Sequence, residues 1–283
     1  MKPAPLDLRV LDDVLKAAVR EDVGSGDVTT AATVPASFQA TGRYTAKQDV
    51  VVAGLAVVAR LLEIVDPVLR YRPLVEDGDF VSVGTAIGEV QGSAASILTG
   101  ERVTLNMLQR MCGIATYTRE YVQRLAGTRT RVVDTRKTVP GLRLLDKYAV
   151  ACGGGSNHRM GLFDAILIKN NHLAFHDSIA AAIAAARRHA GPSPKIEVEV
   201  TSPQDVDAAI QAGADAILLD NFTVEQTREA VRRSGGRVPL ESSGGITLET
   251  IRDYAETGVD IISVGALTHS PPAADIHLRV TRT

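Results

Sequence analysis

Residues 196–221 read IEVEVTSPQDVDAAIQAGADAILLDN, and this stretch indicates the architecture of the larger part of the chain. An apolar, β-rich run at 196–200 precedes a helical pattern at 203–212, and a second β-rich run follows at 216–219. A Thr-Ser-Pro sequence supplies hydroxyls just before the helical pattern, and Gly213 stands where that helix should end. A strand, a helix and a strand in succession predict two parallel neighbours in one sheet.

The same alternation extends from about residue 130 to the end of the chain. Six strands alternating with helices predict a parallel sheet, and the polar residues after each strand favour its closure into a barrel. Because a complete barrel has eight strands, we expect an incomplete β/α barrel of six or seven, with 153–162 as one place for a further strand. The strands are expected at 131–135, 165–168, 196–200, 216–219, 239–241 and 261–264, and the helices at 177–189, 203–212, 224–233 and 248–257.

The first part of the chain has a different texture. An amphipathic segment at 6–20 is followed by short β-like runs broken by glycine, with a helical stretch at 55–65 among them. This pattern predicts a small N-terminal α/β sandwich domain. We therefore divide the chain into that domain, residues 1–110, and a barrel domain, residues 111–283, whose C-terminal tail can pack on the first domain.

Composition narrows the class of protein. The net charge of −2 argues against general nucleic-acid binding. Residues 102–169 nevertheless hold twelve Lys/Arg and four Asp/Glu, a local balance of +8. Such a concentration of cations in an acidic chain is consistent with a site for small anions, and equally with a solvated basic face.

Targeting signals and cysteines suggest a location. The longest apolar stretch, 50–59, is about half of the roughly 20 residues that a membrane-spanning helix needs. The N-terminus has no apolar signal core. The only cysteines, Cys112 and Cys152, fit a reducing compartment, and we expect a cytoplasmic protein without membrane or nucleic-acid partners.

The residues that follow the predicted strands carry the chemistry. In a β/α barrel the carboxyl ends of all strands meet at one mouth. Early strands are followed by cations, which can clamp an anionic substrate, and middle strands by carboxylates, which can hold hydroxyls or a metal. Late strands are followed by glycine-rich loops, which expose backbone N–H groups to a phosphate. In chain order the strand ends read DTRK (134–137), KNNH (169–172), EVE (197–199), DN (220–221), SSGG (242–245) and SVGA (263–266).

Several longer motifs resemble the quinolinate phosphoribosyltransferase family, in the expected order and over nearly the whole chain. They are EDVGSGDVTT (21–30), GERVTLNMLQRMCGIAT (100–116), DTRKTVPGLRLLDKYAVACGGGSNHRMGLFDAILIKNNH (134–172), EVEV (197–200), LLDN (218–221), ESSGGI (241–246) and SVGALTHS (263–270).

This resemblance implies an α/β sandwich joined to an incomplete β/α barrel, and transfer of phosphoribosyl from phosphoribosyl pyrophosphate (PRPP) to quinolinate. Decarboxylation follows, giving nicotinate mononucleotide, pyrophosphate and CO2 for the de novo biosynthesis of NAD, with Mg²⁺ as cofactor. The resemblance also implies a homodimer with shared active sites, which can assemble further, in which one subunit's N-terminal domain covers its partner's barrel mouth.

Residue roles follow from the same resemblance. Arg102 is expected to reach the partner's site, and the anion pocket is expected to be lined by Thr135, Arg136, Lys137, His158, Arg159 and Lys169. Glu199 and Asp220 are implied on the ribose and magnesium side. The 5-phosphate is assigned to Ser243, Gly244, Gly245, Val264 and Gly265, and the catalytic roles to Lys137, Lys169, Glu199 and Asp220.

Alternatives remain at this point. Lys169 could serve as the amine of a Schiff-base lyase, and a relative associated with molybdenum transport shares the expected fold. Residues 77–92 resemble the hairpin of biotinyl carriers but lack the lysine that such carriers modify. Glu199 and Asp220 could also be mere caps of the following helices.

Overall fold

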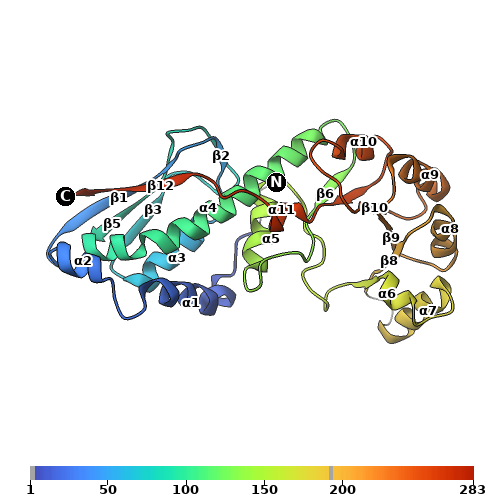
Figure 1. Ribbon diagram of the computed structural model, residues 1–283, viewed down its shortest axis with the longest axis horizontal. Coiled ribbons are helices and arrows are strands. Elements are labelled where there is room, and N and C mark those ends of the chain that lie inside the picture. The colour runs from blue at the N-terminus through green and yellow to red at the C-terminus, as the bar shows by residue number, and fades with distance from the viewer. Residues whose placement is uncertain (1–3, 191–193) are drawn as a thin grey trace. The chain divides into compact units, whose positions relative to one another are not determined.

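The computed structural model (Figure 1) describes residues 4–190 and 194–283, which form two compact units. The first unit holds the chain up to Arg119, together with Val139–Gly154 and Ser270–Thr283. The second unit holds Glu120–Thr138 and Gly155–His269.

A four-stranded antiparallel sheet of order β12-β1-β5-β3 forms the centre of the first unit. Side chains alternate along β1, so that Tyr44 and Ala46 are buried. They share one hydrophobic cluster with Leu62 of α3 and Ile97 of α4. The elements of this unit are η1 (Leu8–Leu11), α1 (Asp12–Val23), α2 (Val28–Thr33), β1 (Gln39–Ala46), β2 (Val50–Val51), α3 (Leu55–Val65), β3 (Arg70–Pro73), β4 (Phe80–Val81), β5 (Ala86–Ser93), α4 (Ala94–Arg124, up to Arg119), α5 (Arg143–Cys152) and β12 (Ile276–Arg282).

Two segments from later in the chain belong to this first unit. Strand β12 pairs with β1 from Ala46 opposite Ile276 to Ala40 opposite Arg282. Helix α5 is held by Asp146, whose buried carboxylate accepts two hydrogen bonds, of 2.9 and 2.8 Å, from the guanidinium of Arg110. The unit therefore takes in residues outside 1–110, and the domain boundary drawn from the sequence stays a prediction.

The second unit is built on six parallel strands in the order β6-β11-β10-β9-β8-β7, with α7, α8 and α9 packed against the sheet (Figure 1). A single parallel bridge adds Ser156 beside Val133 of β6. The expected incomplete β/α barrel is thereby confirmed, and the bridge lies in the 153–162 stretch where a further strand was sought. The elements are β6 (Arg131–Val133), β7 (Ile166–Ile168), α6 (Asn170–Leu173), α7 (Ile179–Ala190), β8 (Ile196–Val200), α8 (Pro203–Gln211), β9 (Ala216–Asp220), α9 (Val224–Ser234), β10 (Leu240–Ser243), α10 (Ile251–Ala255), β11 (Ile261–Ser263) and α11 (Ala266–His269).

Capping side chains fix where the barrel helices begin. Ser202 Oγ accepts a hydrogen bond from the backbone N–H of Asp205 at the start of α8, and Thr223 forms a reciprocal capping box at the start of α9. Helix α10 begins three residues later than the expected 248–257, because the side chain of Thr250 accepts a 3.0 Å hydrogen bond from Thr247 N–H and closes a turn before the helix. It also ends two residues earlier, at Ala255. None of the helices among the described residues has the length and apolar character needed to cross a bilayer.

Candidate active site

The carboxyl ends of the barrel strands surround a cavity of about 510 Å³ in the second unit. Eleven of the predicted site residues line it, so the structure brings together residues spread over more than a hundred positions of sequence. These eleven are Thr135, Arg136, Lys137, His158, Arg159, Lys169, Glu199, Asp220, Ser243, Gly244 and Gly245.

Three predicted residues do not line this cavity. Arg102 is exposed on α4 in the first unit. Val264 is buried, and its N–H donates to the carbonyl of Val133. Gly265 lies against a cavity residue, since a Cβ placed there would come within 2.9 Å of Lys137 Cδ. Val264 and Gly265 therefore pack against residues of the cavity wall without lining the cavity.

The cationic wall of the cavity comes from β6, β7 and the chain between them. The turn after β6 is fixed at Lys137, whose N–H donates to Thr135 Oγ1 and whose carbonyl accepts from Thr268 Oγ1. Arg159 donates to the carbonyl of Ala165 at 3.0 Å. Burial, together with repulsion from Arg136, lowers the pKa of Arg159 from its usual value. The repulsion between these like-charged side chains is unfavourable, and a bound anion would offset it.

The carboxylates stand at the ends of β8 and β9. Glu199 is 8% exposed, and its oxygens face the backbone N–H of Asn170 at 3.2 Å and Lys169 Nζ at 3.6 Å. Asp220 ends β9 and pairs in register with Ser243 of β10. Both side chains therefore border the cavity from adjacent strands, and neither residue is the cap of the helix that follows.

The glycine loop after β10 completes the mouth. Gly244 and Gly245 both adopt positive φ, at 106° and 62°. A Cβ at Gly244 would overlap Asn221 Oδ1 and lie 3.0 Å from Asn221 N. Asn221 itself has φ 56° and donates its N–H to the carbonyl of Ser243 at 2.8 Å. The loops after β9 and β10 are thus locked together, leaving bare backbone of the kind that binds phosphates.

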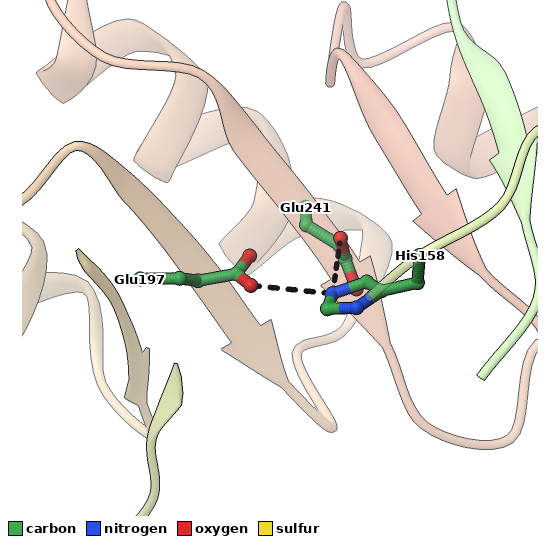
Figure 2. Close-up of side chains that lie close together, drawn as sticks. All are labelled: His158, Glu197 and Glu241. Atoms are coloured by element: carbon green, nitrogen blue, oxygen red, sulfur yellow. Dashed lines mark ion pairs between the residues drawn. The ribbon is translucent and has the colours of Figure 1, made fainter. Parts of the chain in front are cut away.

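His158, Glu197 and Glu241 form a cluster of close side chains (Figure 2), and His158 and Glu241 of this cluster line the cavity. His158 Nε2 is 3.2 Å from a carboxylate oxygen of Glu197 and 3.4 Å from one of Glu241. Burial alone would lower the pKa of His158, but the two carboxylates outweigh it and raise the pKa to about 10. Burial raises the pKa of Glu197, and the hydrogen bond from His158 opposes that rise.

Five residues that line this cavity received no individual role from the sequence, although two of them, Asn221 and Ser263, stand in the strand-end segments expected at the mouth. Glu241 could have been found from the sequence, because a carboxylate inside a strand that is expected to be buried rarely serves packing alone. The others depend on register and loop conformation. The five are Leu167, Leu218, Asn221, Glu241 and Ser263.

An open β/α barrel whose mouth joins a cationic wall, two carboxylates and a glycine loop defines an α/β-barrel enzyme acting on phosphorylated and carboxylated anions. Residues 114–279 match the model of the quinolinate phosphoribosyl transferase C-terminal domain, and residues 27–112 match that of the N-terminal domain. The chain belongs to the quinolinate phosphoribosyltransferase family.

Similar proteins agree with this assignment. The carboxylating nicotinate-nucleotide pyrophosphorylase of Mycobacterium leprae is 47% identical, covering 94% of this chain and 95% of that protein. A probable enzyme of the same name from Bacillus subtilis is 42% identical, covering 92% and 90%. Among solved structures, NadC from Streptococcus pyogenes has a TM-score of 0.95 at 42% identity and 99% coverage of both chains. The nicotinate-nucleotide pyrophosphorylase of Francisella tularensis has a TM-score of 0.93 at 37% identity, with 99% coverage of both.

Proposed function

We propose that this chain transfers the phosphoribosyl group of PRPP to quinolinate and releases CO2, giving nicotinate mononucleotide and pyrophosphate for de novo NAD biosynthesis. One observation carries the proposal: five cationic side chains converge on a single cavity that also holds two carboxylates and a glycine loop. The five are Arg136, Lys137, His158, Arg159 and Lys169. A dicarboxylate needs several such groups to orient its ring.

The residues divide the reaction between them. The cationic wall orients quinolinate so that its ring nitrogen attacks C1 of the phosphoribosyl group while the bond from C1 to pyrophosphate breaks. Glu199 and Asp220 lie where a carboxylate can hold the ribose hydroxyls and stabilise an oxocarbenium-like C1. The positive charge gained by the ring nitrogen then accepts the electron pair left at C2 as CO2 departs, and a proton adds at C2. Lys137 and Lys169 hold the anions in place.

We assign Mg²⁺ as the cofactor. Glu199 already faces an N–H and an ammonium, so its oxygens are partly engaged, whereas Asp220 borders the cavity without such a pairing among the described residues. This donor set fits a magnesium ion held mainly by substrate phosphates with one or two carboxylates, as is usual for Mg²⁺. When bound, the ion would neutralise charge on the departing pyrophosphate.

Quinolinate should be strongly preferred over nicotinate. Nicotinate has a single carboxylate, so part of the cationic wall would stay buried and unpaired. We expect kcat/KM for nicotinate to be about a thousandfold lower, equivalent to about 4 kcal/mol. Quinolinate-dependent release of pyrophosphate from PRPP tests both the preference and the function; comparable turnover of nicotinate would contradict the preference, and no turnover of quinolinate would contradict the function.

We further infer that the chain acts as a homodimer with shared sites, which can stack into larger assemblies, in the cytoplasm. Arg102 supports the first inference, because it is exposed and forms no ion pair within residues 4–190 and 194–283. The cytoplasmic location is consistent with Cys112 and Cys152, which are both buried free thiols.

Hybrid dimers test the sharing of sites. Arg102→Ala should abolish most activity while fold and dimer persist, because the residue lies on an exposed helix face. Mixing it with Lys169→Ala should restore up to half of the wild-type activity per hybrid, since one site of each hybrid is intact. Two different affinity tags, one on each variant, and purification over both in turn would verify the hybrids. Verified hybrids that stay inactive would place both residues in the site of one subunit.

The alternatives gain no support from the site. A Schiff-base lyase using Lys169 would need a proton relay, and no tyrosine lines the cavity in the described part of the chain. The relative associated with molybdenum transport is disfavoured by the complete cationic wall. Residues 77–92 hold β4 and β5, but these strands do not pair with each other: β4 pairs with β2, and β5 lies between β1 and β3 in the first unit's sheet. The hairpin suggested by the sequence of this stretch is therefore wrong.

A further inference from the structure

Glu197 and Glu241, the two carboxylates beside His158, have no role in the proposed reaction. They come from β8 and β10, which flank β9, and both oxygens nearest the ring approach the same imidazole nitrogen (Figure 2). Glu241 is only 3% exposed and lines the cavity, yet its Oε1 has no hydrogen-bond partner in the described part of the chain.

A half-buried and a buried carboxylate around one nitrogen are unfavourable unless a positive charge lies between them. An uncompensated carboxylate is strongly destabilised away from water, and two such groups repel each other as well. The imidazole of His158 is the group within hydrogen-bond distance of both. The cluster is therefore best balanced when that ring carries a proton on each nitrogen.

We propose that Glu197 and Glu241 are positioning residues that fix Nε2 of His158 and keep its imidazole positively charged as part of the wall that recognises quinolinate. The proposal rests on the proposed function for the identity of the ligand, but not for the charge of the ring. It explains why a histidine, ordinarily neutral above pH about 6.5, can serve among permanent cations.

Other polar groups also lie against the ring of His158 or its backbone. The backbone N–H of Arg159 donates a 2.8 Å hydrogen bond to Nδ1, which only an unprotonated Nδ1 can accept, so a charged ring requires this N–H to turn to another acceptor. Asp134 is buried and accepts the backbone N–H of His158 at 2.9 Å, which adds a third carboxylate beside this segment. Two carboxylates on Nε2 outweigh one amide dipole, in line with the raised pKa of His158.

Recognition of a dianion follows from this arrangement. A charged ring presents an Nδ1–H beside the Arg159 N–H, so that two donors face a place where one ligand oxygen can accept from both. Binding of a carboxylate at this place would then satisfy the ring and the Arg159 N–H together. A neutral His158 would offer at most one of these interactions.

The test compares Glu241→Gln, which keeps shape and removes charge, with Glu225→Gln on the exposed start of α9 as the matched control. KM and kcat for quinolinate and for PRPP are measured from pH 6.5 to 8.5. We expect Glu241→Gln to raise the quinolinate KM about tenfold at pH 8. The effect should be smaller at pH 6.5, and KM for PRPP should change little. An unchanged quinolinate KM would overturn the proposal.

Nitrogen NMR of labelled histidines reads the ring charge directly and needs no substrate. With the signal assigned by its loss in His158→Asn, the wild-type ring should be an imidazolium at pH 8 and become neutral in Glu241→Gln. A neutral wild-type ring at pH 8 would overturn the proposal even if the enzyme turns over quinolinate. Stoichiometric metal in purified wild-type protein that is lost in Glu241→Gln would overturn it in favour of a metal site. Should Glu241→Gln fail to fold, the wild-type spectrum and Glu197→Gln decide.

Discussion

Replacing Gly244 by alanine should lower kcat/KM at least about a hundredfold while the protein stays folded. Gly244 has φ 106°, which a residue with a side chain rarely adopts, and its missing Cβ is the space that Asn221 occupies. The added methyl must push apart the loops after β9 and β10, and these carry Asp220 and the glycine backbone assigned to phosphate. A displacement of about 1 Å at such a site is enough for the expected loss. Steady-state kinetics with quinolinate and PRPP measures it.

A matched control separates strain from misplacement. Gly236 has φ 77° and open space around its Cβ position, and it lies on the loop between α9 and β10, away from the cavity. Gly236→Ala should therefore lose about 1 kcal/mol of stability and keep its activity. Adding Asn221→Ala to Gly244→Ala should recover part of the activity, because it removes the overlapping Oδ1. Wild-type rates for Gly244→Ala alone would contradict the proposed role of this loop.

The strands and the polar residues at their ends could be predicted because both depend on short, local sequence patterns. Apolar runs with glycine after the helices placed β8 and β9 to within a residue, and the polar residues after each strand pointed to one mouth. The boundaries of α10 could not be predicted in the same way. Both Thr247 and Thr250 are suitable caps in sequence, and only the turn between them decides that the helix starts at Ile251.

The cluster of His158, Glu197 and Glu241 could not be predicted from local sequence patterns. Glu197 and Glu241 are 44 positions apart in sequence, and neither segment indicates which basic side chain the carboxylates will contact. Their meeting with His158 depends on two strands flanking β9 and on a loop that follows a glycine run. Arg102 shows another limit, because the role expected for it depends on a second copy of the chain.

Removing either mouth carboxylate should reduce turnover far more than quinolinate binding. Glu199 and Asp220 border the cavity that is proposed to bind strongly anionic substrates, and carboxylates without another partner would repel those substrates. They make sense if they hold ribose hydroxyls, magnesium or a developing oxocarbenium, so their contribution is largest in the transition state. We expect kcat to fall about a hundredfold to a thousandfold in Glu199→Ala and Asp220→Ala.

The two variants should differ in how they bind quinolinate. Glu199 faces Lys169 at 3.6 Å, so Glu199→Ala frees that ammonium for the substrate, and quinolinate affinity should stay equal or rise. Asp220 has no such pairing among the described residues, and Asp220→Ala should leave the affinity within about threefold. Calorimetric titration with quinolinate, beside kcat under saturating substrates, measures both, with the exposed Asp253→Ala on α10 as control. A variant that lost quinolinate affinity but kept its maximal rate would show that its carboxylate belongs to the acid-binding side of the site instead.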